Sequence, residues 1–434
     1  MNNKKVYVAM SADIIHNGHI NLIKKAAELG EVIIGVLSDE AIASYKRYPL
    51  MPLTERMEII KNLVGVTSVV VQDSLDYENN LRKIKPNYVV HGDDWRVGIQ
   101  STIREKVINV LSEWDGQLVE VPYTKGVSIE NLRSKIDAEG ILPEQRRSRL
   151  SSLLKTKSLV RVMEAHNGLT GLIVENSKVV KNNEIHGFDA IWISSLCDST
   201  AKGKPDIELV DMSSRLDTIN QIMEVTTKPI ILDGDTGGQL EHFVFNIKTL
   251  ERLGVSAIII EDKVGLKKNS LFGTEVEQFQ DSIENFSLKI RAGKQAQRTR
   301  DFMIIARIES LILEQGMDDA LKRARAYVKA GADGIMIHSR QKEATEVFQF
   351  CDQFEKEFPK IPIVVVPTSY SKTYEKELQE HGINIVIYAN HLIRSAFLAM
   401  QNTANSILEN ERAYEASEYC LPIKDIIRLI PGSE

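Results

Sequence analysis

A polar segment of ten residues follows an apolar run beyond the middle of the chain, and its side chains are of types that do chemistry: Glu261-Asp262-Lys263-Val264-Gly265-Leu266-Lys267-Lys268-Asn269-Ser270. The run before it, residues 256–260, predicts a buried strand, and barrel enzymes carry their catalytic groups on the loops at the carboxyl ends of strands. A charged surface loop after a strand is the alternative interpretation. The choice between the two depends on which other polar residues share this arrangement.

A pair of acidic residues, Asp233 and Asp235, has the same relation to an earlier apolar run at residues 228–232. The two carboxylates are two positions apart with a glycine between them, so both can turn toward one hard cation. Magnesium takes oxygen ligands and retains several of its waters. The pair alone is a common turn sequence, but together with Glu261 it predicts a magnesium site.

Further polar residues end other apolar runs in the same half of the chain. They include a guanidinium, whose fork of donors suits a doubly charged anion. A buried tryptophan or a histidine with a structural role would each be ordinary, yet chance would scatter such residues along the chain. The residues at the ends of these runs are Trp192, Ser194, Arg307, Glu309 and His338.

Two histidines near the N-terminus occur in the sequence His16-Asn17-Gly18-His19, between the first apolar run and a helical pattern. Imidazoles three residues apart at a helix N-terminus can contact the phosphates of a nucleoside triphosphate, and the helix end adds positive potential. The glycine lets backbone approach closely. Because the pattern also occurs by chance, its neighbours have to support this interpretation.

Short apolar runs alternate with amphipathic helical patterns over residues 5–136, which predicts a parallel, doubly wound sheet. The expected strands are residues 6–10, 32–37, 68–71, 88–90 and 117–121, and the expected helices include one through Leu22 and Ala26 and one at residues 55–63. The strands stop between residues 137 and 157, where the charged stretch 143–149 is interpreted as the solvated face of a helix at a domain boundary.

Eight further apolar runs, mostly separated by helical patterns, predict a (β/α)8 barrel in the second part of the chain. The expected strands are residues 171–174, 190–193, 230–232, 257–260, 303–306, 334–337, 361–366 and 383–387. We therefore assign residues 1–138 to a nucleotide-binding domain, 139–157 to a linker, and 158–434 to a barrel.

Composition limits the classes of function. The chain has 434 residues, of which 43% are hydrophobic, and a formal net charge of −6. This length predicts more than one domain, and the acidic balance argues against a nucleic-acid partner. No apolar run is long enough to cross a membrane, and residues 1–5 lack the pattern of a secretory signal, so we expect a cytoplasmic protein. The few, widely spaced cysteines favour reduced thiols.

The segment 261–270 matches, without a gap, the E-D-K-x-G-x-K-x-N-S signature of phosphoenolpyruvate mutases, and the second half of the chain resembles that family of TIM barrels. The resemblance implies interconversion of phosphoenolpyruvate and phosphonopyruvate, with Mg²⁺ held by Asp233, Asp235 and Glu261. It implies catalytic roles for Asp206, Lys267, Asn269, Ser270, Arg307 and His338, and substrate binding by Trp192, Ser194, Ser195 and Leu196. Ser195 stands where the family usually has glycine.

The same segment separates the mutases from their relatives. Lyases of the superfamily carry a K-[KR]-C-G-H loop, whose cysteine serves in carbon–carbon cleavage, and this chain has Lys267-Lys268-Asn269-Ser270 there. Phosphonopyruvate hydrolases tend to place threonine at the position of Ser270. Asn269 and Ser270 therefore favour a mutase, with a hydrolase as the alternative.

Residues 5–136 resemble glycerol-3-phosphate cytidylyltransferase and its relatives, a Rossmann-like fold with the H-x-G-H motif. The resemblance implies catalytic roles for His16 and His19 and nucleotide contacts from Lys46, Arg56, Gly92, Asp93, Asp94, Trp95 and Ser128. Where the family has R-T-E-G-I-S-T, this chain has Tyr123-Thr124-Lys125-Gly126-Val127-Ser128-Ile129, so the second substrate is expected to differ from glycerol 3-phosphate. As an alternative, Asp93 and Asp94 could cap a helix.

The two resemblances together imply a bifunctional enzyme of phosphonate biosynthesis. One domain would form a C–P bond, and the other would transfer CMP from CTP to a small phosphonate such as 2-aminoethylphosphonate or 2-hydroxyethylphosphonate. The alternative is a mutase whose N-terminal domain binds a nucleotide without turning it over. Barrels of this family usually assemble with swapped terminal helices, so a homo-oligomer, tetramer or dimer, is expected, with residues 406–430 at the subunit interface.

Overall fold

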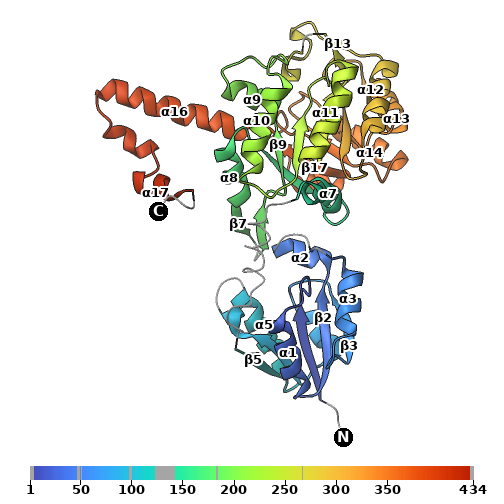
Figure 1. Cartoon of the computed structure of the whole chain (residues 1–434), viewed down its shortest axis with the longest axis vertical. Coiled ribbons are helices and arrows are strands. Elements are labelled where there is room, and N and C mark those ends of the chain that lie inside the picture. The colour runs from blue at the N-terminus through green and yellow to red at the C-terminus, as the bar shows by residue number, and fades with distance from the viewer. Residues whose placement is uncertain are drawn as a thin grey trace. The chain divides into compact units, whose positions relative to one another are not determined.

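The computed structural model describes residues 4–45, 49, 51–96, 100–122, 142–181, 184–265 and 267–430. The chain divides into two compact units: residues 1–141 together with 178–187, and residues 142–177 together with 188–434 (Figure 1). The first unit is built on an open parallel sheet and the second on a closed parallel barrel. Both belong to the α/β class that the sequence predicts.

The N-terminal sheet has the strand order β3-β2-β1-β4-β5, and all its pairs are parallel. Its elements are β1 (Lys5–Met10), α1 (Asn17–Ala27), β2 (Glu31–Leu37), α2 (Asp39–Tyr45), α3 (Leu53–Lys61), β3 (Ser68–Gln72), α4 (Glu78–Ile84), β4 (Tyr88–Gly92), the 3-10 turn η1 (Asp93–Arg96), α5 (Gln100–Ser112) and β5 (Gln117–Val121). The five strands predicted from the sequence are all present.

Both faces of this sheet are covered, which explains why its central strand is apolar at successive positions. Val6 and Val8 of β1 pack with Ile23 of α1 on one face. Tyr7 of β1 packs with Leu81 of α4 on the other face. The chain leaves β1 toward α1 and leaves β4 toward η1, so the loops after β1 and β4 lie at the same edge of the sheet. This is the point at which the strand order reverses, where doubly wound folds bind their ligands.

The second unit contains a closed barrel of eight parallel strands in the order β6-β9-β10-β11-β14-β15-β16-β17. The strands are β6 (Val160–Glu164), β9 (Ala190–Ile193), β10 (Ile230–Asp233), β11 (Ala257–Glu261), β14 (Met303–Ile308), β15 (Gly334–Ile337), β16 (Ile363–Val365) and β17 (Ile383–Tyr388). The helices are α7 (Pro143–Leu154), α8 (Gly168–Asn176), α9 (Ser195–Ala201), α10 (Met212–Met223), α11 (Leu240–Leu253), α12 (Ile283–Ala296), α13 (Met317–Ala330), α14 (Thr345–Glu357), α15 (Glu375–Glu380), α16 (His391–Asn410) and α17 (Ile423–Arg428). The remaining elements are two short antiparallel strand pairs and two 3-10 segments. The pairs are β7 (Lys178–Lys181) with β8 (Glu184–Gly187) and β12 (Lys263–Val264) with β13 (Phe279–Gln280), and the 3-10 segments are η2 (Ser270–Glu275) and η3 (Glu415–Tyr419).

Seven of the eight barrel strands lie where the sequence predicts them, and the first prediction was wrong. Residues 171–174 belong to the helix α8, and the first barrel strand is β6. Asn167 caps α8, because its side chain accepts a hydrogen bond from the backbone of Thr170 and its own backbone amide donates to the Thr170 hydroxyl. This reciprocal cap starts a helix where hydrophobicity alone suggests a strand.

The charged stretch 143–149 is also not the solvated surface that the sequence suggested. It opens α7, in which Arg146 and Arg147 are buried and donate to the backbone carbonyls of Thr226 and Glu251 at 2.8 Å each. Leu150 and Leu153 on the same helix pack with the residues that fill the barrel interior. Most of the residues assigned to a linker therefore belong to the barrel unit.

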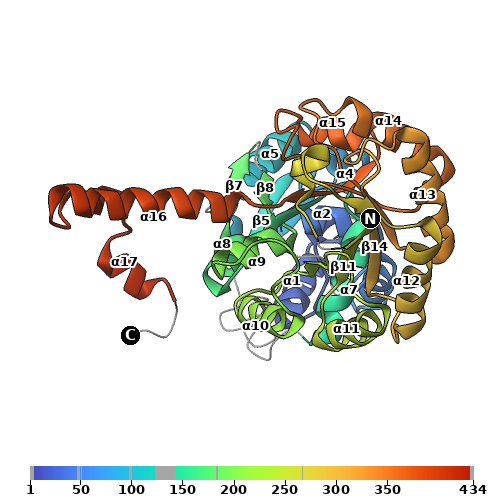
Figure 2. The same ribbon diagram turned by 90° about the horizontal axis from the view of Figure 1, so that it is seen from above.

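The C-terminal helices α16 and α17 extend away from the barrel (Figure 2). No residue of α16 is buried, and large apolar side chains such as Leu408 and Ile423 are 77% and 71% exposed. Among the described residues, no helix combines the length and the apolar character needed to cross a membrane.

Candidate active sites

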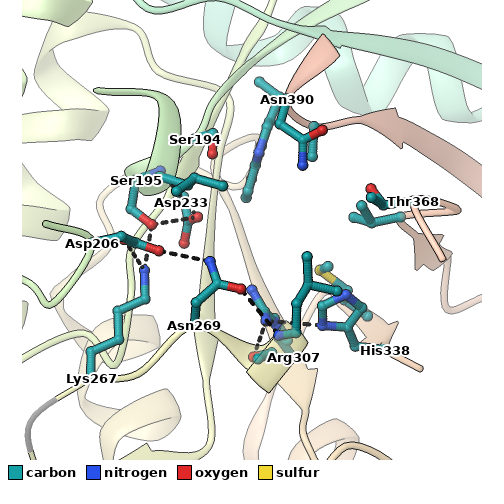
Figure 3. A pocket seen from close by; sticks show the side chains of 17 residues that line it. Ser194, Ser195, Asp206, Asp233, Lys267, Asn269, Arg307, His338, Thr368 and Asn390 are labelled. Carbon is teal, nitrogen blue, oxygen red and sulfur yellow. Dashed lines mark hydrogen bonds and ion pairs between the residues drawn. The ribbon is translucent and has the colours of Figure 1, made fainter. Parts of the chain in front are cut away.

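A pocket lies at the carboxyl end of the barrel and is lined by residues that end or follow its strands (Figure 3). The lining includes Asp233 and all of the barrel residues to which the sequence assigned catalysis or substrate binding: Trp192, Ser194, Ser195, Leu196, Asp206, Lys267, Asn269, Ser270, Arg307 and His338. It adds residues that the sequence did not single out: Leu271, Met336, Val366, Thr368, Ala389 and Asn390.

Asp233, the last residue of β10, is held by backbone and side-chain donors. Its Oδ2 accepts hydrogen bonds from the amide of Ser195 at 3.2 Å and from the hydroxyl of Ser195 at 3.0 Å. Its Oδ1 accepts from the amide of Asp235 at 3.2 Å. Burial opposes ionisation of Asp233, but the charges of Lys267 and Arg307 outweigh it and lower the pKa of this carboxyl.

Lys267 lies buried among acidic residues from different loops. Its ammonium donates to Asp206 at 2.8 Å and also contacts Asp235 and the hydroxyl of Ser195. Burial alone would lower its pKa, yet Asp235 and Asp233 raise it above the usual value. Lys267 is therefore a permanent positive charge that joins the loop after β11 to the loops after β9 and β10.

Asn269 and Ser270 lie beyond Lys267 on the loop between β12 and β13. The amide of Asn269 donates to Asp206 at 3.0 Å. The hydroxyl of Ser270 accepts from Arg307 at 2.6 Å and from Lys263 at 3.0 Å, and it donates to Glu309. This loop therefore covers the pocket through side chains that are already bonded to the barrel.

Arg307 and His338 form the part of the pocket beneath Ser270. Arg307 donates from Nε to Glu309 at 2.5 Å and from Nη2 to Nδ1 of His338 at 3.0 Å. A guanidinium can only donate, so Nδ1 of His338 is the acceptor and the proton of the neutral ring is on Nε2. Burial, together with the charge of Arg307, lowers the pKa of His338 and favours this neutral form.

Glu309 belongs to the site, although the sequence analysis gave it no role beyond its position at a strand end. Burial opposes its ionisation, but Arg307 and Lys263 hold its pKa well below the usual value. The signal that could have assigned it is its spacing of two residues from Arg307, which turns both side chains to one side of the strand.

Glu261 ends β11 with both carboxylate oxygens buried, and within the described residues neither oxygen accepts a hydrogen bond. Lys263 and Arg307 approach it at 3.2 and 3.3 Å. Burial raises its pKa to about 7. A buried acid with unused acceptor oxygens fits a cation ligand. Among the described residues, no three histidine, cysteine, aspartate or glutamate side chains converge as a metal site.

Behind Asp235 lies a buried arginine that the sequence analysis missed. Arg215 of α10 donates to Asp235 at 3.0 Å, and its Nε lies 3.7 Å from Asp198. Thr218 donates to the other oxygen of Asp198 at 2.7 Å. Arg215 occupies a buried position on an amphipathic helix, and its sequence context carries no signal that it would reach the site.

In the N-terminal unit, His16 and His19 lie at the start of α1, in the loop after β1. Nδ1 of His16 accepts a hydrogen bond from the amide of Gly18 at 3.1 Å, so the neutral ring carries its proton on Nε2. A Cβ at Gly18 would lie 3.0 Å from the ring of His16, so this arrangement favours glycine there. The two rings are 3.9 Å apart between centroids. Burial lowers the pKa of His16, which keeps the ring neutral.

The predicted nucleotide contacts divide into three groups. Gly92 ends β4 and Asp93 follows it, at the same sheet edge as His16. Arg56 and Trp95 are buried: Arg56 donates to the carbonyls of Leu37 and Met51 at 2.7 and 3.0 Å, and Trp95 donates to Glu120 at 3.1 Å. Both side chains are therefore bonded within this unit, and their contact with a nucleotide stays a prediction. Lys46 and Ser128 lie outside the described residues, as does the side chain of Asp94.

Comparison with known proteins agrees with both folds. Residues 150–408 match the family described as Phosphoenolpyruvate phosphomutase, and residues 10–157 match the family described as Cytidylyltransferase-like. The chain is 35% identical to phosphoenolpyruvate phosphomutase of Tetrahymena pyriformis over 65% of its own length and 90% of that protein. The chain therefore belongs to the phosphoenolpyruvate phosphomutase family, with a cytidylyltransferase-like domain before the barrel.

Two solved structures extend the comparison. The structure of phosphoenolpyruvate phosphomutase from Streptomyces platensis subsp. rosaceus superimposes with a TM-score of 0.60, at 33% identity, over 65% of this chain and 94% of that one. A phosphonopyruvate hydrolase in complex with oxalate and Mg²⁺ superimposes with a TM-score of 0.56, at 34% identity, over 67% of this chain and 95% of that one. The two similarities are close to equal, so overall similarity does not separate mutase from hydrolase.

Proposed function

We propose that the barrel interconverts phosphoenolpyruvate and phosphonopyruvate by moving a phosphoryl group within one molecule. The main support for this proposal is that the loop 267–278 lies closed over the pocket and is bonded to the barrel. Asn269 is hydrogen-bonded to Asp206, and Ser270 to Arg307. A phosphoryl group transferred without water needs a site that is covered while the group is between its two bonding positions.

Different side chains would contact the phosphoryl group and the three-carbon unit of the substrate. Arg307, Asn269, Ser270 and Nε2–H of neutral His338 are donors that can hold the oxygens of the phosphoryl group as its charge spreads in the transition state. Trp192, which lines the pocket, would pack against the planar three-carbon unit, which must stay in position while the group moves.

Asp233 lines the pocket, and Asp235 and Glu261 contact the lining residues Lys267 and Arg307. This group of acids suits a magnesium ion. Asp233, Asp235 and Glu261 would hold it, with waters completing its shell, and when bound it would supply positive charge beside the enolate oxygen. The orientation of these acids is set by the chain itself: Ser195 fixes Asp233, and Arg215 with Lys267 fixes Asp235.

Hydrolysis of phosphonopyruvate is the second candidate for the barrel, because a phosphonopyruvate hydrolase is about as similar to this chain as a mutase is. The sequence of the loop 267–278 favours the mutase, since Ser270 stands where the hydrolases tend to have threonine. Carbon–carbon lyase chemistry is disfavoured, because the loop 267–278 has no cysteine. Cys197, in the helix α9, is buried and donates to the carbonyl of Ala389 at 3.2 Å, and burial raises its pKa.

Phosphorus NMR with Mg²⁺, starting from phosphonopyruvate, tests the barrel proposal. We expect Asn269→Ala to lower the rate about 10²–10³-fold, as is typical for losing one preorganised donor, and Asp233→Ala to abolish turnover. Asn176→Ala, which removes an exposed amide on α8, is the matched control. Retained turnover in Asp233→Ala would contradict the proposed metal role of Asp233. Phosphate and pyruvate as the main products of the wild-type protein would show that the barrel is a hydrolase.

For the N-terminal unit we propose transfer of CMP from CTP to a small phosphonate, 2-aminoethylphosphonate or 2-hydroxyethylphosphonate. This rests on the cytidylyltransferase-like match and on His16, whose Nε2–H is free of the internal bond made by Nδ1. An imidazole donor aimed at the α-phosphate would stabilise charge that grows as the bond to pyrophosphate breaks. A nucleotide-binding domain without turnover is the alternative.

Release of pyrophosphate distinguishes these two possibilities. CTP, ATP, GTP and UTP are each paired with 2-aminoethylphosphonate, 2-hydroxyethylphosphonate, glycerol 3-phosphate and phosphocholine. We expect release with CTP and one phosphonate, and its loss in His16→Ala with phosphonopyruvate turnover intact. Absence of release from folded wild-type protein with every pair would leave nucleotide binding alone as the role of this domain.

A further inference from the structure

Besides the contacts that Lys267, Asn269 and Ser270 make in the pocket, the loop over the pocket is attached to the barrel at its base and at its tip. These two attachments differ in character. Its base is buried: the ammonium of Lys263, only 3% exposed, donates to the carbonyl of Lys268 at 2.9 Å and to Gln278 at 3.0 Å. Gln280, at the far end of the loop, donates to the buried carboxyl of Asp262 at 3.0 Å. These contacts fix the two ends of the loop.

The tip of the loop, residues 271–275, is attached by Arg340, a residue two positions beyond His338 in the loop after β15. Its guanidinium donates to the carbonyl of Phe272 at 3.4 Å and to the hydroxyl of Thr274 at 3.2 Å. It also pairs with Glu314, in the loop after β14, at 2.9 Å. Arg340 therefore connects the tip to two barrel loops.

The backbone of the tip is shaped for this guanidinium. Gly273 has a φ of 52°, a conformation that favours glycine, and a Cβ built there would overlap the guanidinium of Arg340. The side chain of Gln278 donates to the carbonyl of Gly273 at 2.7 Å and keeps this turn in place. The close approach of Arg340 thus depends on the residue type at position 273.

The tip contact is suited to opening and closing. The side chains of Arg340 and Glu314 are 27% and 65% exposed, and exposed ion pairs contribute little free energy. Ser270 is three residues before Gly273, so the tip that Arg340 holds is continuous with the groups that touch the phosphoryl site. Breaking the weak contact at the tip would leave Asn269 and Ser270 as the attachments of the covering segment, while the buried base stays fixed.

We propose that Arg340 determines reaction specificity by holding the loop closed and keeping water from the phosphoryl group. This rests on the mutase function proposed above. With the loop closed, the enolate oxygen bonds to phosphorus as the C–P bond breaks, giving phosphoenolpyruvate. With it open, a water oxygen bonds to phosphorus, the C–P bond breaks, and the enolate carbon takes up a proton, giving phosphate and pyruvate.

Product ratio is the first test. Wild-type protein, Arg340→Gln and Gly273→Ala are given phosphonopyruvate and Mg²⁺, and phosphate and phosphoenolpyruvate are measured by phosphorus NMR. We expect each variant to raise the ratio of phosphate to phosphoenolpyruvate about 1.5- to fivefold, the range that an exposed ion pair can supply. The double variant should add little to either single one, because both changes break the same contact.

Arg325→Gln is the matched control, because Arg325 makes a bidentate, exposed pair with Glu357 at 2.7 Å on the outside of the barrel. Hydrogen exchange of the amides of residues 271–275, followed by mass spectrometry, is the second test, and we expect faster exchange in Arg340→Gln than in the control. An unchanged product ratio or unchanged exchange overturns the role of Arg340 and leaves the mutase proposal intact. Phosphate as the main wild-type product overturns both.

Discussion

Replacing Lys263 by methionine is expected to weaken the barrel and the site together. Its buried ammonium lies 3.2 Å from Glu261 and 3.5 Å from Glu309, and it donates to Ser270 at 3.0 Å. Methionine keeps the length of the side chain and removes the charge. Glu261 and Glu309 would then share Arg307 as the counter-charge that both contact.

The magnitude follows from the distances. At an effective dielectric constant of roughly 20, each of the two close pairs is worth about 5 kcal/mol of Coulomb energy, and the ammonium's own cost of burial offsets much of that sum. Removing one partner of a buried ion pair typically costs about 3–5 kcal/mol. We therefore expect the free energy of unfolding to fall by about that amount.

Urea unfolding of the full chain, followed by circular dichroism, measures this change. Lys294→Met is the matched control: Lys294 pairs with Asp333 at 2.7 Å, but both side chains are about a quarter exposed, at 26% and 27%. A pair that is partly open to solvent is screened and contributes less than a buried one, about 1 kcal/mol or below. The kcat for phosphonopyruvate should also fall in Lys263→Met and stay constant in the control, because Lys263 holds Ser270.

A loss no larger in Lys263→Met than in Lys294→Met would refute this reasoning. It would show that the neighbouring acids do not need the ammonium as a counter-charge. A full loss of stability with unchanged kcat would refute the second part alone, because the loop would then be positioned without Lys263.

Two predictions concern the organisation of the chain. A chain that starts at Leu142 should keep phosphonopyruvate turnover, because α7 begins at Pro143 and packs with the barrel interior; an insoluble or inactive product would contradict this. Residues 406–430 should lie at a subunit interface, because apolar side chains such as Leu408 and Ile423 are largely exposed in a single chain. Light scattering should give a dimer or tetramer, and a monomer would contradict the prediction.

Most strands could be predicted from the sequence because a parallel strand buried on both faces is apolar throughout. The first barrel strand could not, because Arg161 and Glu164 interrupt its apolar residues, whereas residues 171–174 are uninterrupted and yet helical. The cap at Asn167 was the local signal that distinguished them. Hydrophobic runs therefore predicted the barrel but misplaced its first strand.

Some residues around the site could likewise be predicted from the sequence, and others could not. Those at strand ends, such as Asp233 and Arg307, could be found because a parallel barrel brings strand ends to one edge. Arg215 could not, because its contact with Asp235 depends on how α10 packs. The burial of Arg146 was likewise hidden, since its Nη2 donates to backbone carbonyls that the sequence does not place nearby.

The most direct test of the central claim is turnover of phosphonopyruvate by the wild-type protein in water enriched in oxygen-18, with phosphorus NMR as the readout. Transfer within one molecule takes no oxygen from the solvent. We therefore predict phosphoenolpyruvate as the product, with no isotope shift of its phosphorus signal. Phosphate carrying one solvent oxygen, formed together with pyruvate, would contradict the mutase function of the barrel.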